Sequence, residues 1–114
     1  MAISEPYSNT ATISTTEYSL VNNSTTLASI TDDGVYQVFV DLFNLAVGDE
    51  YEIKIKEKVT SGGTQRTLYT AYQDGDIDEP FVTPSLILLH GWDVTMKKIA
   101  GTDRSISWSI RKVV

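Results

Sequence analysis

Apolar and polar side chains alternate with a period of two over the segment Tyr51–Val59. One face of this segment carries the apolar residues Tyr51, Ile53, Ile55 and Val59, and the other face carries Glu52, Lys54, Lys56 and Lys58. Such alternation is typical of a strand that buries one face and exposes the other to water. Glu57 breaks the pattern because it points to the apolar side, so we expect it near a sheet edge or beside a partner group.

Glycine-containing turns separate this segment from further strands. Gly62 and Gly63 suit a tight hairpin leading to a strand over 65–72. The turn at 100–103 joins strands over 93–99 and 104–113, and alternation with serines in the last strand predicts that Trp108 lies in the core. Other strands are expected over 10–15, 17–21, 25–30 and 35–41. Pro84 keeps the stretch 81–90 from forming a central strand.

Seven to nine short strands predict one all-β domain, an antiparallel β-sandwich of immunoglobulin-like or jelly-roll-like type. The segment Leu45–Tyr51 resembles the tyrosine corner of immunoglobulin-like sandwiches, in which the tyrosine hydroxyl bonds to backbone a few residues upstream. We expect the domain to cover residues 9–114. For residues 1–8, an N-terminal arm and a frayed terminus are both open.

The charge distribution excludes some partners. The net charge is −6, and residues 1–53 contain eight acidic residues and no lysine or arginine. An acidic chain repels phosphate backbones, so we expect no nucleic-acid binding. The apolar stretch 84–92 is far shorter than a membrane span, and the first residues lack a secretory signal pattern, so we expect a soluble protein without a membrane partner.

Residues for catalysis or metal binding are scarce. The chain has no cysteine and one histidine, which excludes thiolate sites and most zinc sites. His90 has no G-x-S-x-G serine to activate, and Ser85 follows a proline in an apolar context. No pair among the 15 acidic residues stands out for glycoside hydrolysis. We therefore expect no catalytic residues, no cofactor and no metal, in a protein that is not an enzyme.

The acidic loop Gln73–Glu79 carries four carboxylates between Asp74 and Glu79. Alternating aspartates are able to converge on Ca²⁺, but an EF-hand loop needs glycine at its sixth position, and Gly75 is the second residue here. A solvated acidic turn is the favoured interpretation, and a calcium site is the alternative.

Trp92 is the aromatic residue most suggestive of ligand binding. It follows His90 and Gly91 in an expected loop, so it is the one tryptophan that is a candidate for exposure. An exposed Trp92 ring, or an exposed cluster among the six tyrosines, could stack on a sugar, which makes carbohydrate binding an alternative function. A loop tryptophan that plugs one end of the sandwich is the favoured interpretation.

The row Lys54, Lys56 and Lys58 forms a basic stripe on one strand face. A solvated face, or a guard of a sheet edge against aggregation, is the simpler interpretation. The alternative is that the stripe meets the acidic N-terminal half of a neighbouring copy in a homo-oligomer.

Three segments, Asp32–Leu42, Gly48–Arg66 and Ala100–Arg111, resemble short virion proteins of tailed bacteriophages, some of which are head decoration or cement proteins. The resemblance implies a non-enzymatic structural protein that binds the major capsid protein on the exterior of the virion and is made in the host cytoplasm. It also implies a homo-oligomer, with a trimer favoured. A tail or fibre accessory module that aids host adsorption is the alternative of similar appearance.

Overall fold

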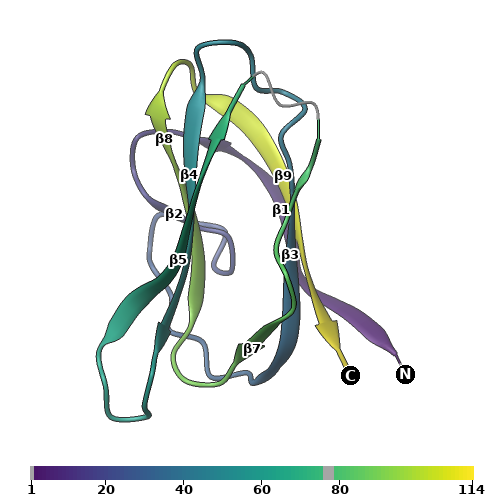
Figure 1. Ribbon diagram of the computed structural model, residues 1–114, viewed down its shortest axis with the longest axis vertical. Helices are drawn as coiled ribbons and strands as arrows, with labels where there is room; N and C mark the ends of the chain where they lie inside the picture. Colours follow the sequence, from purple (N-terminus) through teal and green to yellow (C-terminus); the bar gives the residue numbers. More distant parts are fainter. Residues whose placement is uncertain (1, 76–78) are drawn as a thin grey trace.

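Two antiparallel sheets pack face to face in the computed structural model, which describes residues 2–75 and 79–114 (Figure 1). Sheet A contains β1, β9, β3, β6 and β7, and sheet B contains β2, β8, β4 and β5. The strands are β1 (Ile3–Ile13), β2 (Tyr18–Ser19), β3 (Gly34–Asp41), β4 (Glu50–Lys58), β5 (Gln65–Asp74), β6 (Phe81–Val82), β7 (Leu86–Leu88), β8 (Asp93–Ala100) and β9 (Arg104–Val113). The described residues contain no helix long and apolar enough to cross a membrane.

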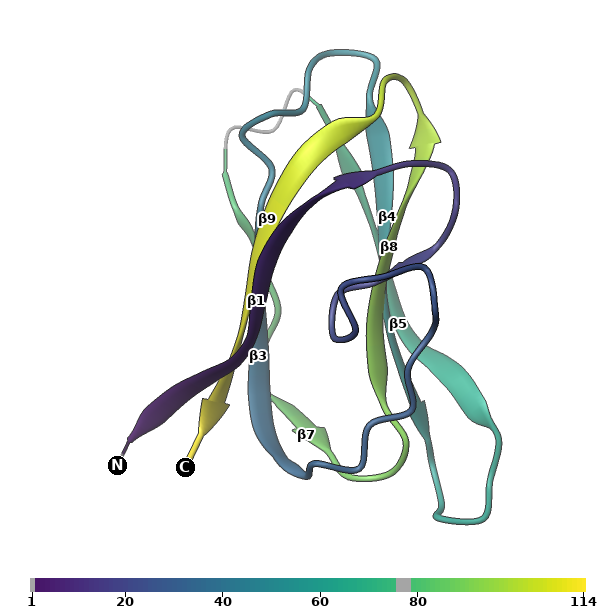
Figure 2. The same cartoon turned by 180° about the vertical axis from the view of Figure 1, so that it is seen from behind.

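The strand pairing is that of a jelly roll, one of the two forms expected from the sequence. The first strand pairs with the last, β2 with β8, β3 with β6 and β7, and β4 with β5, so the chain is a long antiparallel ribbon wound on itself. The predicted antiparallel β-sandwich is thus confirmed. Seen from behind, β1 and β9 run side by side and both chain ends emerge at the same end of the molecule (Figure 2).

The core lies between the sheets and collects the apolar faces of the alternating strands. One buried cluster contains Tyr36, Val38 and Val40 of β3, Tyr51, Ile53 and Ile55 of β4, and Ile106, Trp108 and Ile110 of β9. Trp108 is in the core, as predicted, and its indole N–H donates to the Leu20 carbonyl at 2.9 Å. Each large side chain buried in this way contributes roughly 1.5–3 kcal/mol of transfer free energy.

Strand prediction succeeded where alternation was regular and failed where it was not. The strands expected over 35–41, 51–59, 65–72, 93–99 and 104–113 correspond to β3, β4, β5, β8 and β9. The segment 25–30 is not a strand, because it pairs with the rest of the chain only through a single bridge between Ile30 and Trp92. Val59 lies beyond the end of β4 and is 73% exposed, which corrects its expected place on the buried face.

Proline shapes one edge of sheet A, as predicted. Two short strands, β6 and β7, lie on either side of Pro84, and both pair with β3. At the N-terminus, residues 3–8 belong to β1 and pair with β9, with a bulge between Ser4 and Tyr7. The segment considered as an arm is therefore part of a sheet in this structure.

The hydroxyl of Tyr51 bonds across the sandwich and not to the backbone just upstream of it. It donates to the Thr102 carbonyl at 2.7 Å and accepts from the Arg104 backbone N–H at 2.8 Å. The tyrosine-corner comparison therefore predicted a backbone partner correctly but placed it in the wrong segment.

Glu57 meets a partner, as its inward position predicted. Its carboxylate accepts hydrogen bonds from the backbone N–H groups of Leu89 at 2.5 Å and His90 at 2.9 Å. The residue thus fastens the loop before β8 to the end of β4.

A candidate docking surface on the outer face of sheet A

Four aliphatic side chains form a row across the outer face of sheet A, the face turned away from sheet B. The register pairs Ile3 with Val113, Val113 with Val35, and Val35 with Ile87. Directly opposed residues on neighbouring strands carry their side chains on the same face. The four residues therefore make a continuous apolar row over β1, β9, β3 and β7, which we call the aliphatic row.

The aliphatic row is exposed to solvent. The exposed fractions are 59% for Ile3, 40% for Val113, 37% for Val35 and 81% for Ile87. Single exposed apolar residues are common, whereas a contiguous group on one face is a candidate for an interaction site.

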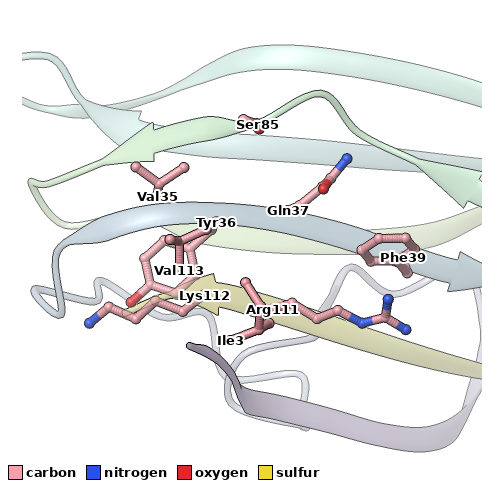
Figure 3. Close-up of a pocket in the computed structure, with 9 residues that line it drawn as sticks. All are labelled: Ile3, Val35, Tyr36, Gln37, Phe39, Ser85, Arg111, Lys112 and Val113. Atoms are coloured by element: carbon pink, nitrogen blue, oxygen red, sulfur yellow. The ribbon is translucent and has the colours of Figure 1, made fainter. Parts of the chain in front are cut away.

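A groove of about 210 Å³ includes three residues of the row, Ile3, Val35 and Val113, and extends from them along β3 and β9 (Figure 3). Its lining includes Ile3, Val35, Gln37, Phe39, Ser85, Arg111 and Val113. Figure 3 shows Val35 and Gln37 pointing to the same side of β3, and Arg111 extending along the sheet toward the ring of Phe39. The groove is thus formed by neighbouring strands of one sheet, which hold its walls in fixed register.

Polar groups surround the groove and are held in place. The guanidinium carbon of Arg111 lies 3.8 Å from the centroid of the Phe39 ring, as in a cation–π contact. The Gln37 amide donates to the Thr83 carbonyl at 2.7 Å, and the Lys112 ammonium pairs with Asp32 at 2.9 Å. An apolar centre with a polar rim that includes arginine is the arrangement found in protein–protein interfaces.

Trp92 is buried, which excludes the alternative that its ring is exposed. Its exposed fraction is 0%, and its indole N–H donates to the Asp32 carbonyl at 3.0 Å. The rings of Tyr7 and Tyr36 pack on it, with centroids 5.7 Å and 4.6 Å away. Trp92 therefore plugs one end of the sandwich, which was the favoured interpretation, and it offers no ring to a sugar.

His90 and Ser85 occupy separate settings. The His90 backbone N–H binds Glu57, and the hydrogen bonds of the described residues include none made by its imidazole. Ser85 is exposed and lines the groove on the outer face of sheet A. The structure records no interaction that brings the two residues together.

The acidic loop is only partly described. Asp74 ends β5, Gly75 donates its N–H to the Asp49 carbonyl at 2.9 Å, and residues 76–78 lie outside the described residues. Among the residues that the structure describes, no group of three metal-binding side chains gathers. The prediction of a solvated acidic turn therefore stays a prediction.

Two lysines of the basic stripe pair with carboxylates of their own chain. The Lys56 ammonium lies 2.6 Å from Glu17, and the Lys54 ammonium lies 3.4 Å from Glu52. These two charges are thus already balanced within the chain on the outer face of sheet B. The edge-guard interpretation is wrong, because β4 lies between β8 and β5.

A buried carboxylate on the outer face of sheet B escaped sequence analysis. Asp93 is 0% exposed and accepts hydrogen bonds from the Ser19 hydroxyl at 2.7 Å and the Ala28 backbone N–H at 2.9 Å. Burial raises the pKa of this group above its usual value, against the opposing effect of the hydrogen bonds. Nothing in the local sequence distinguishes Asp93 from an ordinary exposed residue at the start of a strand.

A second buried carboxylate, Asp49, lies between the turn before β4 and the turn that joins β8 to β9. Asp49 accepts from the backbone N–H groups of Ala46 at 2.8 Å and Thr102 at 2.9 Å and from the Arg104 guanidinium at 2.7 Å. These donors lower the pKa of Asp49 to about 2. A Cβ at Gly101 would lie 2.2 Å from the Asp49 carboxylate, so this turn requires glycine. The role of Asp49 is to join two turns.

Comparison with known proteins finds similarity of fold. No model of a protein family matches the chain, and no curated protein matches it either. Among solved structures, the chain is similar to the crystal structure of Yersinia pseudotuberculosis-derived mitogen (YPM), with a TM-score of 0.56 and 15% sequence identity. The match covers 99% of this chain and 86% of that chain. At this identity, the likeness establishes a shared β-sandwich fold.

Proposed function

We propose that this protein is a non-enzymatic structural protein of a tailed-bacteriophage virion, a head decoration or cement protein that binds the major capsid protein. The observation that carries the proposal is the aliphatic row, because it is apolar, exposed and continuous across four strands. The sequence resemblance to short virion proteins supplies the biological setting. The protein would be made in the host cytoplasm and sit on the capsid exterior.

The mechanical demands of that role fit the molecule. A cement protein must hold its shape while it bridges neighbouring subunits, and sheet registers fix the spacing of Ile3, Val113, Val35 and Ile87 across the row. Jelly rolls recur among viral capsid and lectin domains, so the fold by analogy is compatible with either role. The carbohydrate-binding alternative requires an exposed Trp92 or an exposed cluster of tyrosines. Trp92 is buried, whereas Tyr69 and Tyr72 of β5 are 45% and 58% exposed. The preference for capsid binding therefore rests on the aliphatic row and on the sequence resemblance.

The acidic charge also suits an exterior position. A protein of net charge −6 does not compete for packaged DNA, and it is repelled by phosphate backbones. The affinity of docking through an apolar row with Arg111 at its rim would then depend more on the apolar surface that docking buries than on ionic strength.

Binding to expanded empty heads of a tailed bacteriophage tests the proposal. We expect saturable co-sedimentation and symmetric extra density in images of the particles. Because Ile87 is 81% exposed, Ile87→Asp should leave the fold intact while placing a charge in the row. We expect it to weaken binding about ten-fold or more.

Val47→Asp is the matched control, since Val47 is 87% exposed and lies in the turn before β4, outside the row. It should bind as the wild type does. Absence of saturable binding by the wild type at high concentration, or equal loss in both variants, would overturn the proposal.

A further inference from the structure

A second hollow lies on the outer face of sheet A, at the end of β3 that is remote from the aliphatic row. In the register of β3 with β9, Phe39 lies opposite Ser109, and Asp41 lies opposite Ser107. These four side chains face outward, because the residues between them on both strands are buried in the core. The hollow has a volume of about 330 Å³, and we call it the distal cleft. Its lining includes Phe39, Asp41, Pro80, Ser107, Ser109 and Arg111.

An exposed aromatic ring lies at the rim of the distal cleft. Phe43 is 82% exposed, and with Asp41 it lines two further hollows, of about 50 Å³ and 250 Å³, that share residues with the cleft. The turn that carries Phe43 is anchored on both sides, because Leu42 and Leu45 are buried in the core. The Asp41 carboxylate also accepts the Phe43 backbone N–H at 3.0 Å. The fold therefore fixes the backbone of Phe43 without covering its ring.

The polar groups around the cleft are oriented by the fold and keep atoms available to a ligand. The Asn44 amide donates to the Ser105 carbonyl at 2.8 Å, which leaves its own oxygen as an acceptor. The Arg111 Nε–H donates to the Ser109 hydroxyl at 3.1 Å. Among the described residues, no hydrogen bond or ion pair engages Asp41 Oδ2, Asn44 Oδ1 or the terminal nitrogens of Arg111. The cleft thus presents two acceptors and a set of donors beside an aromatic ring.

This combination of groups matches the chemistry of a sugar. A pyranose ring has a face of C–H groups that packs on an aromatic ring, and hydroxyls at its rim that both donate and accept hydrogen bonds. The apolar contact here is a ring at the rim and not a deep pocket, which suits a sugar better than an anchoring protein side chain. Asp41 and Arg111 have opposite charges, so the cleft favours a neutral ligand.

We propose that the distal cleft binds a neutral oligosaccharide, with one sugar ring stacked on Phe43 and its hydroxyls bonded to Asp41, Asn44 and Arg111. This site differs from the carbohydrate site considered from the sequence, which requires Trp92 or a cluster of tyrosines. Preorganised groups lose little freedom when a ligand binds, and the anchored turn supplies that condition.

Sugar binding at the distal cleft is a function beyond capsid docking and does not depend on it. Val35 of the aliphatic row and Asp41 of the cleft are six residues apart on β3, which is about 20 Å along a strand. Arg111 lies between the two sites and lines both hollows (Figure 3). The experiment therefore changes residues that belong to one site only.

Titrations with neutral hexasaccharides of glucose, mannose, galactose and N-acetylglucosamine, followed by saturation-transfer NMR, test the proposal. We expect at least one of them to bind with a dissociation constant of about 1 mM or lower. Phe43→Ala removes the stacking ring and should weaken this binding about ten-fold or more, while urea unfolding stays unchanged because the ring is exposed. Asp41→Asn keeps an acceptor for the Phe43 N–H but removes the charged acceptor for the sugar, so it should weaken binding about ten-fold.

Tyr72→Ala is the matched control, because Tyr72 is also an exposed ring, at 58%, but lies on β5 of sheet B. It should bind the sugar as the wild type does. Ile87→Asp should also retain sugar binding while it weakens binding to empty heads, so failure of one proposal is distinguishable from failure of the other. Absence of binding by every hexasaccharide at about 10 mM, or unchanged binding by Phe43→Ala, would overturn the proposal. Loss of binding in Tyr72→Ala alone would also overturn it and assign the site to β5.

Discussion

The outer faces of the two sheets differ in whether their side chains have partners within the chain. On sheet B, Asp93 and Lys56 are paired with groups from the segment 17–28 of the same chain. On sheet A, Val35, Val113 and Ile87 lie side by side and remain exposed. The chain therefore supplies partners for the polar groups of sheet B and leaves the apolar side chains of sheet A exposed. The difference separates residues that the fold requires from residues that are free to serve association.

Removing the buried carboxylate of sheet B should have the largest effect on stability. Asp93→Ala leaves the Ala28 N–H and the Ser19 hydroxyl without their acceptor in a buried position. We expect the free energy of unfolding, measured in urea, to fall by about 2–3 kcal/mol.

On sheet A, Ile87→Ser should change this free energy by about 0.5 kcal/mol or less, because the side chain already faces water. If Asp93→Ala left the free energy of unfolding unchanged and Ile87→Ser lowered it strongly, the division between the two faces would be wrong.

The ion pair on sheet B should contribute less. Glu17→Gln weakens the contact with Lys56 at 2.6 Å and the hydrogen bond from the Thr95 hydroxyl at 2.6 Å. Because both side chains are partly exposed, we expect a loss of about 1 kcal/mol at low salt and a smaller loss at high salt. Urea unfolding at two ionic strengths measures it, and a loss that does not change with salt would show that the charge is not what matters there.

The pH dependence of the two carboxylates on sheet B should have opposite signs. Burial raises the pKa of Asp93 above 3.8, so stability is lost as the pH rises through the raised value. Partial burial acts against it, but hydrogen bonds from Lys56 and Thr95 and the nearby lysine charges lower the pKa of Glu17 below 4.5. The stability that Glu17 contributes is therefore complete above pH 4.5 and is lost as the pH falls through the lowered value.

Urea unfolding of Asp93→Asn and Glu17→Gln beside the wild type, between neutral and acidic pH, measures this contrast. Relative to Asp93→Asn the wild type should gain stability on acidification, and relative to Glu17→Gln it should lose stability. Ile87→Ser should follow the wild type at every pH, because no ionisable group is removed. Parallel curves for all the variants would contradict the expected pKa directions.

The strands were predictable because their signal is local. Alternation over 51–59 and 104–113 needs only neighbouring residues, and it located β4 and β9 within two residues at each end. The segment 25–30 has residues that favour strands, but it lacks a partner strand, and pairing is not visible in a single segment. The favoured interpretation of Trp92 as a buried plug was correct, but the rings that cover it, Tyr7 and Tyr36, come from distant parts of the chain and could not be named from the sequence.

The candidate site was not predictable for a similar reason. Ile3, Val35, Ile87 and Val113 are spread over nearly the whole chain, and only the register of four strands brings them into one row. Each one alone looks like an ordinary apolar residue of a strand.

The pairing of β1 with β9 has a consequence for engineering. Ala2 and Val114 exchange reciprocal backbone hydrogen bonds, at 3.3 Å and 2.9 Å, so the two ends are held next to each other. Any tag or fused partner attached at either end therefore sits beside Ile3 and Val113 and can obstruct a binding assay. A circularly permuted chain, linked from 114 to 2 and reopened in the turn at Gly62–Gly63, would carry new ends at the tip of the β4–β5 hairpin. Cargo displayed there would leave the aliphatic row uncovered.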